Sequence, residues 1–300
     1  MIERILIALD GSPESEEILG EVERIAGSRT SLDLLHVIED RPREVPGLGV
    51  LVEDLARPYL ERVARRLPGR SVGIHLRRGK PEDEISRAAR SLNADLIALT
   101  THARKGLSRI FMGSVAESVV RKAAIPVLMT RPHLARPRKP LERLLVPIDG
   151  SPESKQIFES VRHFAKDSDV EVILLQVVEN LIAPDPMLGT SMISMADLVP
   201  DPTSSLRAYA YKLEREGLKT RSMVVFGAPA DQILEQAKIL DVDLIAMAST
   251  GRPGLSRAIR GSVSFKVLRH TDRAVLLHRV THEAPVGEEG HSLHVQEEGS

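Results

Sequence analysis

The sequence lacks cysteine and tryptophan altogether, and aromatic residues make up only 3% of its 300 residues. Without cysteine, disulfide bonds, thiolate metal sites and cysteine nucleophiles are excluded. With so few aromatic side chains, a stacking platform for single-stranded nucleic acid is not expected. Any binding or chemistry must therefore depend on backbone, hydroxyl, carboxylate and basic groups.

An excess of one charge sign is also missing, because 41 Lys and Arg stand against 42 Asp and Glu. Non-specific nucleic-acid binding needs a clear basic excess, so no nucleic-acid partner is expected. No apolar run approaches the roughly 18 residues of a membrane span, and the apolar run at the N-terminus is short and ends at Asp10. We expect a soluble, cytoplasmic protein with no membrane partner.

What the sequence does contain is an internal repeat. The stretch D-G-S-P-E-S occurs at Asp10–Ser15 and again at Asp149–Ser154, each time after a short aliphatic run. A later block, which begins G-L-S-R and ends G-S-V, occurs at 106–115 and again at 254–263. Matched blocks in the same order indicate a duplicated structural unit.

The repeat predicts the domain organisation. Two homologous domains are expected at 1–131 and 142–281. The segment 132–141 between them is rich in proline and basic residues, which is typical of a semi-rigid linker. Residues 282–300 are polar and rich in Gly, Glu and His, so we expect a disordered tail there.

Each half alternates aliphatic runs with segments of helical spacing. In the first half the expected strands are 5–9, 32–38, 72–76, 95–99 and 126–129, and the expected helices are 13–26, 51–67, 81–92 and 113–123. In the second half the expected strands are 143–148, 170–178, 220–226, 243–247 and 273–279. This alternation is typical of parallel sheets covered by helices. We predict an α/β protein of two homologous doubly wound domains, each a five-stranded parallel sheet with helices on both faces.

Two loops in each half have an unusual composition. One is D-G-S-P after the first strand, and the other is the Gly- and Ser-containing loop after the fourth strand. Ligands of doubly wound sheets bind at the carboxyl ends of strands, where the winding reverses. If the first and fourth strands are neighbours, these loops face each other across a crevice, at which Asp10 and Asp149 end their strands.

The loop after the fourth strand suits phosphate groups. Glycine lets backbone N–H groups approach an anion closely, and the start of a helix favours negative charge. Gly113-Ser114 and Gly261-Ser262 each open an expected helix. A glycine turn followed by a serine N-cap, which any helix can have, explains the same residues, and the sequence leaves both interpretations open.

With these motifs, the two halves resemble universal stress protein domains over nearly the whole chain except the linker and the tail. The ATP-binding members of that family carry G-x2-G-x9-G-S/T after the fourth strand. The matching positions are Ala248, Gly251, Gly261 and Ser262 in the second half, and Thr100, Ala103, Gly113 and Ser114 in the first. The second half departs at one glycine and the first half at two. If each departure forces a positive φ, it costs about 1–2 kcal/mol, or about tenfold in affinity.

The resemblance implies roles for further residues. The aspartate that ends the first strand would lie beside the adenosine or a phosphate-bound Mg²⁺, so Asp149 would contact metal only through the nucleotide. The implied adenine neighbours are Val37 and Val177, and the implied backbone contacts to phosphate are at Val115 and Val263. Asp10 is the counterpart of Asp149 in the first half. The Gly and Ser that follow each aspartate are interpreted as a turn and a helix cap.

The resemblance favours a tandem universal stress protein that binds ATP, mainly in its second half, and acts in regulating a stress response. Pairing of the two domains through their fifth strands, around 127–129 and 275–277, and a homodimer of chains are also implied. One alternative is a protein of the same fold that binds no nucleotide and serves as a protein-interaction module. Another is a slow ATP hydrolase, although no hydrolytic motif is visible, so any ATPase activity should be weak.

Overall fold

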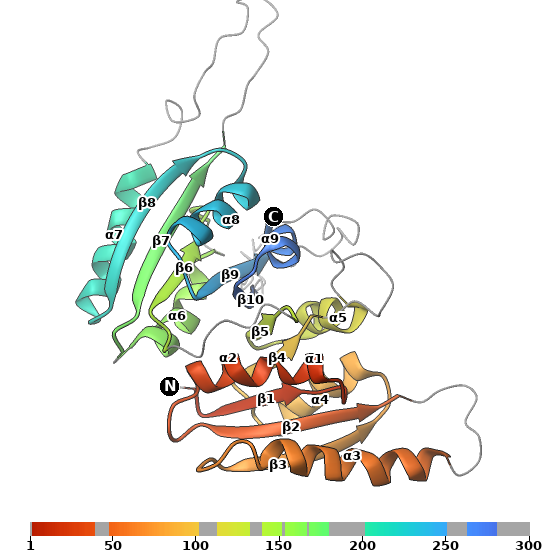
Figure 1. Ribbon diagram of the computed structural model, residues 1–300. Helices are drawn as coiled ribbons and strands as arrows, with labels where there is room; N and C mark the ends of the chain where they lie inside the picture. Colours follow the sequence, from red (N-terminus) through yellow and green to blue (C-terminus); the bar gives the residue numbers. More distant parts are fainter. Residues whose placement is uncertain are drawn as a thin grey trace, which may run out of the picture.

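The computed structural model describes residues 2–39, 48–101, 113–132, 140–151, 154–166, 168–179, 202–250 and 263–280. Its strands form one ten-stranded sheet in the order β3-β2-β1-β4-β5-β10-β9-β6-β7-β8. The first half of the chain supplies β1 to β5 and the second half supplies β6 to β10, so each half is an α/β unit with a five-stranded parallel sheet (Figure 1). The predicted fold class is confirmed.

The elements of the first half alternate as expected. They are β1 (Arg4–Ala8), α1 (Pro13–Glu16), α2 (Ile18–Ile25), β2 (Ser31–Ile38), α3 (Leu48–Ala64), β3 (Val72–Arg78), α4 (Pro81–Ser91), β4 (Leu96–Thr100), α5 (Ser114–Lys122) and β5 (Val127–Thr130). None of the helices that the structure describes is long and apolar enough to cross a membrane.

The second half repeats the order. Its elements are β6 (Arg143–Pro147), the 3₁₀ turn η1 (Ser154–Gln156), α6 (Ile157–Ala165), β7 (Glu171–Val178), α7 (Pro202–Arg215), β8 (Lys219–Phe226), α8 (Pro229–Ile239), β9 (Leu244–Thr250), α9 (Val263–His270) and β10 (Ala274–Val280). Most of the predicted linker and the whole predicted tail lie outside the described residues.

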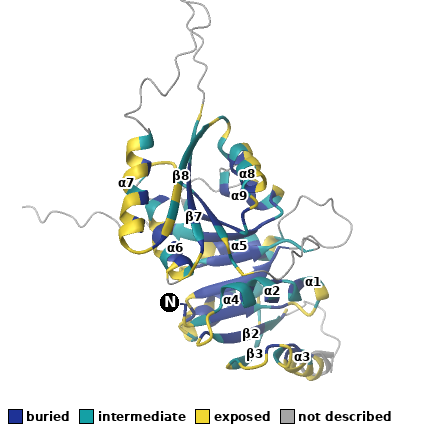
Figure 2. Cartoon of the chain, turned by 60° about the vertical axis from the view of Figure 1, so that its left-hand side comes forward, coloured by how far each residue is buried: buried dark blue, intermediate teal, exposed yellow. Residues whose placement is uncertain are grey.

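The central strands are buried on both faces, which is why they are continuously apolar. In β1, Ile5, Leu6 and Ile7 are all fully buried. Because successive strand residues point to opposite faces, Ile5 and Ile7 join one hydrophobic cluster and Leu6 joins the other. In Figure 2 the buried strands lie between helices whose outer faces are exposed.

The strand order places the reversal of winding next to β1 and β6. β1 pairs in parallel with both β2 and β4. β6 pairs in parallel with both β7 and β9. The first and fourth strands of each half are therefore neighbours, and the loops that follow them leave the same edge of the sheet, as a ligand crevice requires.

The two halves join through their fifth strands. β5 and β10 pair antiparallel, with Leu128 opposite Leu276, Met129 opposite Val275 and Val127 opposite Leu277. All six of these residues are buried. The predicted pairing of the two halves through these strands is confirmed, and the two sheets become one.

Some helix boundaries differ from the prediction. The helix predicted at 13–26 is two helices, α1 and α2, with Glu17 between them. The amide of Glu17 bonds to the carbonyl of Glu14, and that of Gly20 to the carbonyl of Glu17, both at 3.3 Å. These are the i to i+3 bonds of a tighter turn, which interrupts a regular α-helix. The helix predicted at 51–67 is α3, which begins and ends three residues earlier.

Candidate functional site

The turn after β1 is built by its aspartate and serine. Gly11 has a φ of 90°, which favours glycine, and it turns the chain away from the strand. Asp10 Oδ1 accepts hydrogen bonds from the Ser12 amide at 2.9 Å and the Ser12 hydroxyl at 2.6 Å. Ser12 Oγ in turn accepts a bond from the Ser15 amide at 3.1 Å and caps α1. The predicted turn and N-cap are confirmed.

The second half builds the same turn with nearly the same distances. Gly150 has a φ of 84°. Asp149 Oδ1 accepts from the Ser151 amide at 2.9 Å and the Ser151 hydroxyl at 2.6 Å. Ser151 Oγ accepts from the Ser154 amide at 3.1 Å. Each aspartate therefore shapes its own turn besides being a candidate for binding a ligand.

The carboxylate of Asp149 is held ionised. Partial burial alone would raise its pKa, but the hydrogen bonds from the hydroxyl and amide of Ser151 outweigh burial and hold the pKa below its usual value. Both Ser151 bonds end on Oδ1, so Oδ2 takes part in neither. An exposed, charged carboxylate thus lies at the carboxyl end of β6, the strand that pairs with β9.

The other predicted residues of the second half divide between described and undescribed positions. Ala248 lies in β9 and Val263 is the first residue of α9. Val177 is the next-to-last residue of β7 and packs, like Val263, against the same hydrophobic cluster. Gly251, Gly261 and Ser262 lie outside the described residues.

The first half places its predicted residues in the equivalent positions. Val37 is next to last in β2, and Gly113 holds the N-cap position of α5, which Ser114 begins. Val115 and Val37 pack against the same hydrophobic cluster. Thr100 ends β4 and is buried, whereas Ala103 lies outside the described residues.

The first position of the glycine motif is not a left-handed one. Thr100 and Ala248 lie in strands, and the described non-glycine residues with positive φ are Asn93 and Asp241. The expected strain at Thr100 and Ala248 was therefore wrong, because an extended backbone accepts any side chain. A residue larger than glycine at these two positions instead reduces the space beside the strand.

A polar residue of the second strand lies beneath each turn, which the sequence analysis missed. His36 Nδ1 lies 2.9 Å from the Leu9 carbonyl, and a Cβ added to Gly11 would be 3.8 Å from the His36 ring. In the second half the equivalent contact is 3.9 Å, between Gly150 and Gln176. The signal was a polar residue at the same place in the repeated runs L-L-H-V and L-L-Q-V.

Tyr59 of α3 completes the first-half turn and was also missed. Its ring meets that of His36 edge to face, with 6.2 Å between centroids. Burial raises the pKa of Tyr59 to about 12, and the nearby Glu16 and Asp10 carboxylates act in the same direction. The phenol is therefore neutral. Its ring lies beside the first-half turn, on the side of α3.

The described residues offer no ready-made metal site, since no group of three or more His, Asp or Glu side chains gathers among them. A divalent ion at Asp149 would need most of its ligands from a bound ligand or from water. Mg²⁺ often binds in this way, through one or two carboxylates and substrate phosphates. The carboxylate donor present fits that chemistry.

Fold and site together define a class: a tandem of doubly wound α/β units, each with an aspartate turn at the reversal of winding. The model of the universal stress protein family matches residues 1–131 and 140–279. The chain belongs to the universal stress protein family.

Individual relatives agree. A universal stress protein of Methanocaldococcus jannaschii is 30% identical over 139 residues, which cover 45% of this chain and 81% of that protein. A universal stress protein of Mycobacterium bovis is 28% identical over 192 residues, 63% of either chain. The crystal structure of a universal stress protein from Archaeoglobus fulgidus covers 93% of this chain and 97% of that one, with a TM-score of 0.72 and 22% identity. The last comparison supports the tandem fold alone.

Proposed function

We propose that this universal stress protein binds an adenine nucleotide, ATP with Mg²⁺, and acts as a nucleotide-dependent regulator of a stress response. The observation that carries the proposal is the ionised carboxylate of Asp149 at the reversal of winding, after the strand that pairs with β9. A bare carboxylate repels phosphates, whereas a divalent ion between the two is attracted by both and can bridge them.

The rest of the second-half site supports the same ligand. Val177 gives an apolar side chain near the carboxyl end of β7, suited to one face of a purine, and Val263 at the start of α9 is proposed to meet the phosphates through its backbone. The motif that precedes α9 keeps Gly251, Gly261 and Ser262 at the family spacing. Its glycines allow backbone N–H groups to approach phosphate oxygens, and the start of α9 favours negative charge.

The second half is proposed as the better site. Its motif departs from the family pattern only at Ala248, whereas the first half departs at Thr100 and Ala103. Thr100 carries a larger side chain than Ala248 at the end of the strand that faces the aspartate turn. Because both residues lie in strands, backbone strain does not distinguish the two halves. The weaker affinity of the first half is proposed to come from the smaller space beside Thr100 and from the replacement of glycine by Ala103.

The test is isothermal titration of ATP and Mg²⁺ into the full chain, with Gly261→Val and Gly113→Val as a matched pair of variants. The expected result is binding to the wild-type protein, loss of binding in Gly261→Val and near wild-type binding in Gly113→Val. No heat with the wild-type protein, together with no nucleotide retained through purification, would overturn the nucleotide proposal and favour the interaction module.

The hydrolase alternative has its own readout. Phosphate release would be followed in the wild-type protein, in Asp149→Ala and in Gly261→Val. Turnover that depends on Mg²⁺ and disappears in both variants would establish a slow hydrolase. Binding without turnover leaves a regulator whose state follows nucleotide concentration.

A further inference from the structure

A cavity lies at the amino ends of the first-half strands, at the opposite ends of these strands from the Asp10 turn. It has a volume of about 240 Å³ and lies between α4 and the segment that leads into β5. Its lining residues are Ser86, Ala89, Arg90, Asn93, Ala94, Ile97, Ala123, Ala124 and Ile125. Asn93, Ala94 and 123–125 precede β4 and β5, so the cavity lies at the amino ends of the strands.

The second half has the same backbone at this place. Asn93 has a φ of 50° and its counterpart Asp241 a φ of 47°. The amide of Ala94 bonds to the carbonyl of Ala89 at 2.9 Å, and the amide of Val242 to that of Ala237 at 3.1 Å. The two loops can therefore be compared residue by residue.

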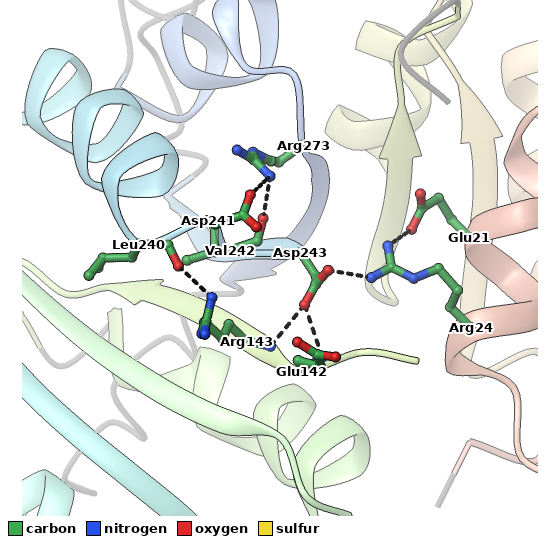
Figure 3. Close-up of polar contacts among 9 residues, drawn as sticks. All are labelled: Glu21, Arg24, Glu142, Arg143, Leu240, Asp241, Val242, Asp243 and Arg273. Atoms are coloured by element: carbon green, nitrogen blue, oxygen red, sulfur yellow. Dashed lines mark hydrogen bonds and ion pairs between the residues drawn. The ribbon is translucent and has the colours of Figure 1, made fainter. Parts of the chain in front are cut away.

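In the second half an arginine side chain fills the equivalent position. Arg273, the counterpart of Ile125, is 5% exposed. Its Nη1 donates to Asp241 Oδ1 at 3.0 Å and to the Val242 carbonyl at 2.9 Å (Figure 3). Its Nε lies 3.1 Å from Asp272 Oδ1. The guanidinium thus lies on the counterparts of Asn93, Ala94 and Ala124, which line the first-half cavity.

The first half keeps the shape of this site but not its charge. Ile125 is too short to reach where the guanidinium lies, and the carbonyl of Ala94 replaces that of Val242. Of the two carboxylates around Arg273, one is replaced by the amide of Asn93 and the other by the methyl group of Ala124. Arg90 lines the cavity and adds a positive charge.

We propose that the first-half cavity binds a planar, uncharged N–H donor, a primary amide or urea group carried on a short apolar stem. The position of the Arg273 guanidinium gives the shape, a flat group whose N–H donors meet a main-chain carbonyl and a side-chain oxygen. The loss of both carboxylates and the presence of Arg90 disfavour a cation there. Ala89, Ile97 and Ile125 provide the apolar surface for the stem.

The probes are ethylurea and ethylguanidinium, which share shape and stem and differ in charge. Each would be titrated into the full chain and followed through the backbone amide resonances in NMR. For the wild-type protein we expect saturable shifts with ethylurea, confined to residues 86–97 and 123–125, and binding of ethylguanidinium at least about tenfold weaker.

Variants test the geometry and the charge separately. Asn93→Asp restores the carboxylate of the second half, so it should reverse the preference towards ethylguanidinium. Ile125→Arg should abolish binding of both probes by filling the cavity, and the double variant Asn93→Asp/Ile125→Arg reproduces the second-half pair should the single variant fold poorly. Lys238→Ala, at the counterpart of Arg90, is the control that should change nothing.

The proposal is overturned if ethylurea gives no saturable shifts, or if its shifts persist in both variants that carry Arg at position 125. It is also overturned if Asn93→Asp leaves the preference between the two probes unchanged. None of these outcomes depends on nucleotide binding, because the cavity shares no lining residue with either candidate nucleotide site.

Discussion

Arg24 of the first half forms an ion pair with Asp243 of the second, with 2.6 Å between Arg24 Nη2 and Asp243 Oδ1 (Figure 3). Both side chains are largely buried, at 6% and 14% exposed, and Arg24 Nη1 also binds Glu21 at 2.9 Å. Asp243 Oδ2 accepts the amides of Glu142 and Arg143 at 2.9 Å. The pair thus ties α2 to the start of β6 and β9, across the β5–β10 seam.

The two halves are not symmetric in this contact. Asp95, the counterpart of Asp243, accepts the amides of Glu3 and Arg4 in the same way, at 2.8 and 2.9 Å. The counterpart of Arg24 in the repeat is His163, whose pKa is lowered by burial in spite of the opposing effect of the Asp95 and Glu159 carboxylates. One side of the pseudo-twofold axis therefore carries a permanent charge pair, and the other carries a titratable group.

Removal of the Arg24 side chain is expected to loosen the pairing of the halves. Arg24→Ala leaves a largely buried Asp243 oxygen without its cation, so it should lower the free energy of unfolding by about 1–3 kcal/mol. Urea denaturation measures the change. Arg121→Ala is the control, since Arg121 makes an exposed 3.7 Å pair with Glu117, and it should cost less than about 1 kcal/mol. Equal effects of the two variants would contradict a specific role for Arg24.

A second prediction concerns Gly73, whose lack of a side chain leaves space for the carboxylate of Asp33. Asp33 Oδ1 lies 2.7 Å from His75 Nε2, and a Cβ on Gly73 would be 2.2 Å from that same oxygen. Gly73→Ala must displace the buried carboxylate from its partner, and about 2–3 kcal/mol of stability should be lost. The midpoint of thermal unfolding gives the readout.

Gly20→Ala is the matched control for Gly73→Ala. Gly20 lies in α2 with no atom within 4 Å of its added Cβ, so alanine should stabilise the helix by about 0.5–1 kcal/mol. Should both substitutions shift stability in the same direction, the close approach of Asp33 to Gly73 is not what sets the cost.

The sequence predicted the features that repeat locally. The fully apolar run around Ile5–Ile7 specified a strand buried on both faces, and D-G-S-P specified a turn with a serine cap because each residue type there has a backbone role. The repeat then placed each turn at the carboxyl end of the first strand of its own half, where the winding reverses. Such features depend on neighbours in the sequence, or on a topology rule that is nearly invariant.

Contacts between distant segments were beyond that reasoning. Nothing in the residues around Arg24 indicates Asp243, and the side chain of Arg273 becomes informative only beside Ile125 in the superimposable loop. The strain assigned to Ala248 was wrong for a related reason. A motif gives residue spacing without backbone angles, and the position proved to lie inside a strand.

Stability should fall as the pH is lowered through the histidine range. Burial lowers the pKa of His163 and of His278, whose Nδ1 lies 2.9 Å from Ser160 Oγ. A lowered pKa means that the unfolded chain binds more protons than the folded one, so this stability is present above the unfolded value of about 6.5 and is lost as pH falls through the folded values. Urea midpoints at about pH 7.5 and about pH 5.5 measure the loss.

A variant isolates the contribution of His278 to this pH dependence. His278→Gln removes one titrating group and keeps a polar partner for Ser160, so the difference between the two urea midpoints should shrink. His270→Gln is the control, because His270 is exposed on α9. An unchanged pH difference in His278→Gln would show that this group does not couple to folding.

The Ser151 hydroxyl joins the fold to the candidate site, and two substitutions separate these roles. It donates to Asp149 Oδ1 at 2.6 Å and accepts the Ser154 amide at 3.1 Å. Ser151→Ala loses both bonds, so stability should fall by about 1 kcal/mol and the pKa of Asp149 should rise, because burial then acts with less opposition.

Ser151→Gly also loses both bonds, but glycine is tolerated at an N-cap and costs only a few tenths of a kcal/mol. Its Asp149 pKa should rise while stability is nearly kept. Carboxyl titration by NMR and urea denaturation measure the two effects. A pKa that stays low in both variants would mean that the backbone amides of the turn and the Ser154 hydroxyl hold Asp149 ionised without the Ser151 side chain.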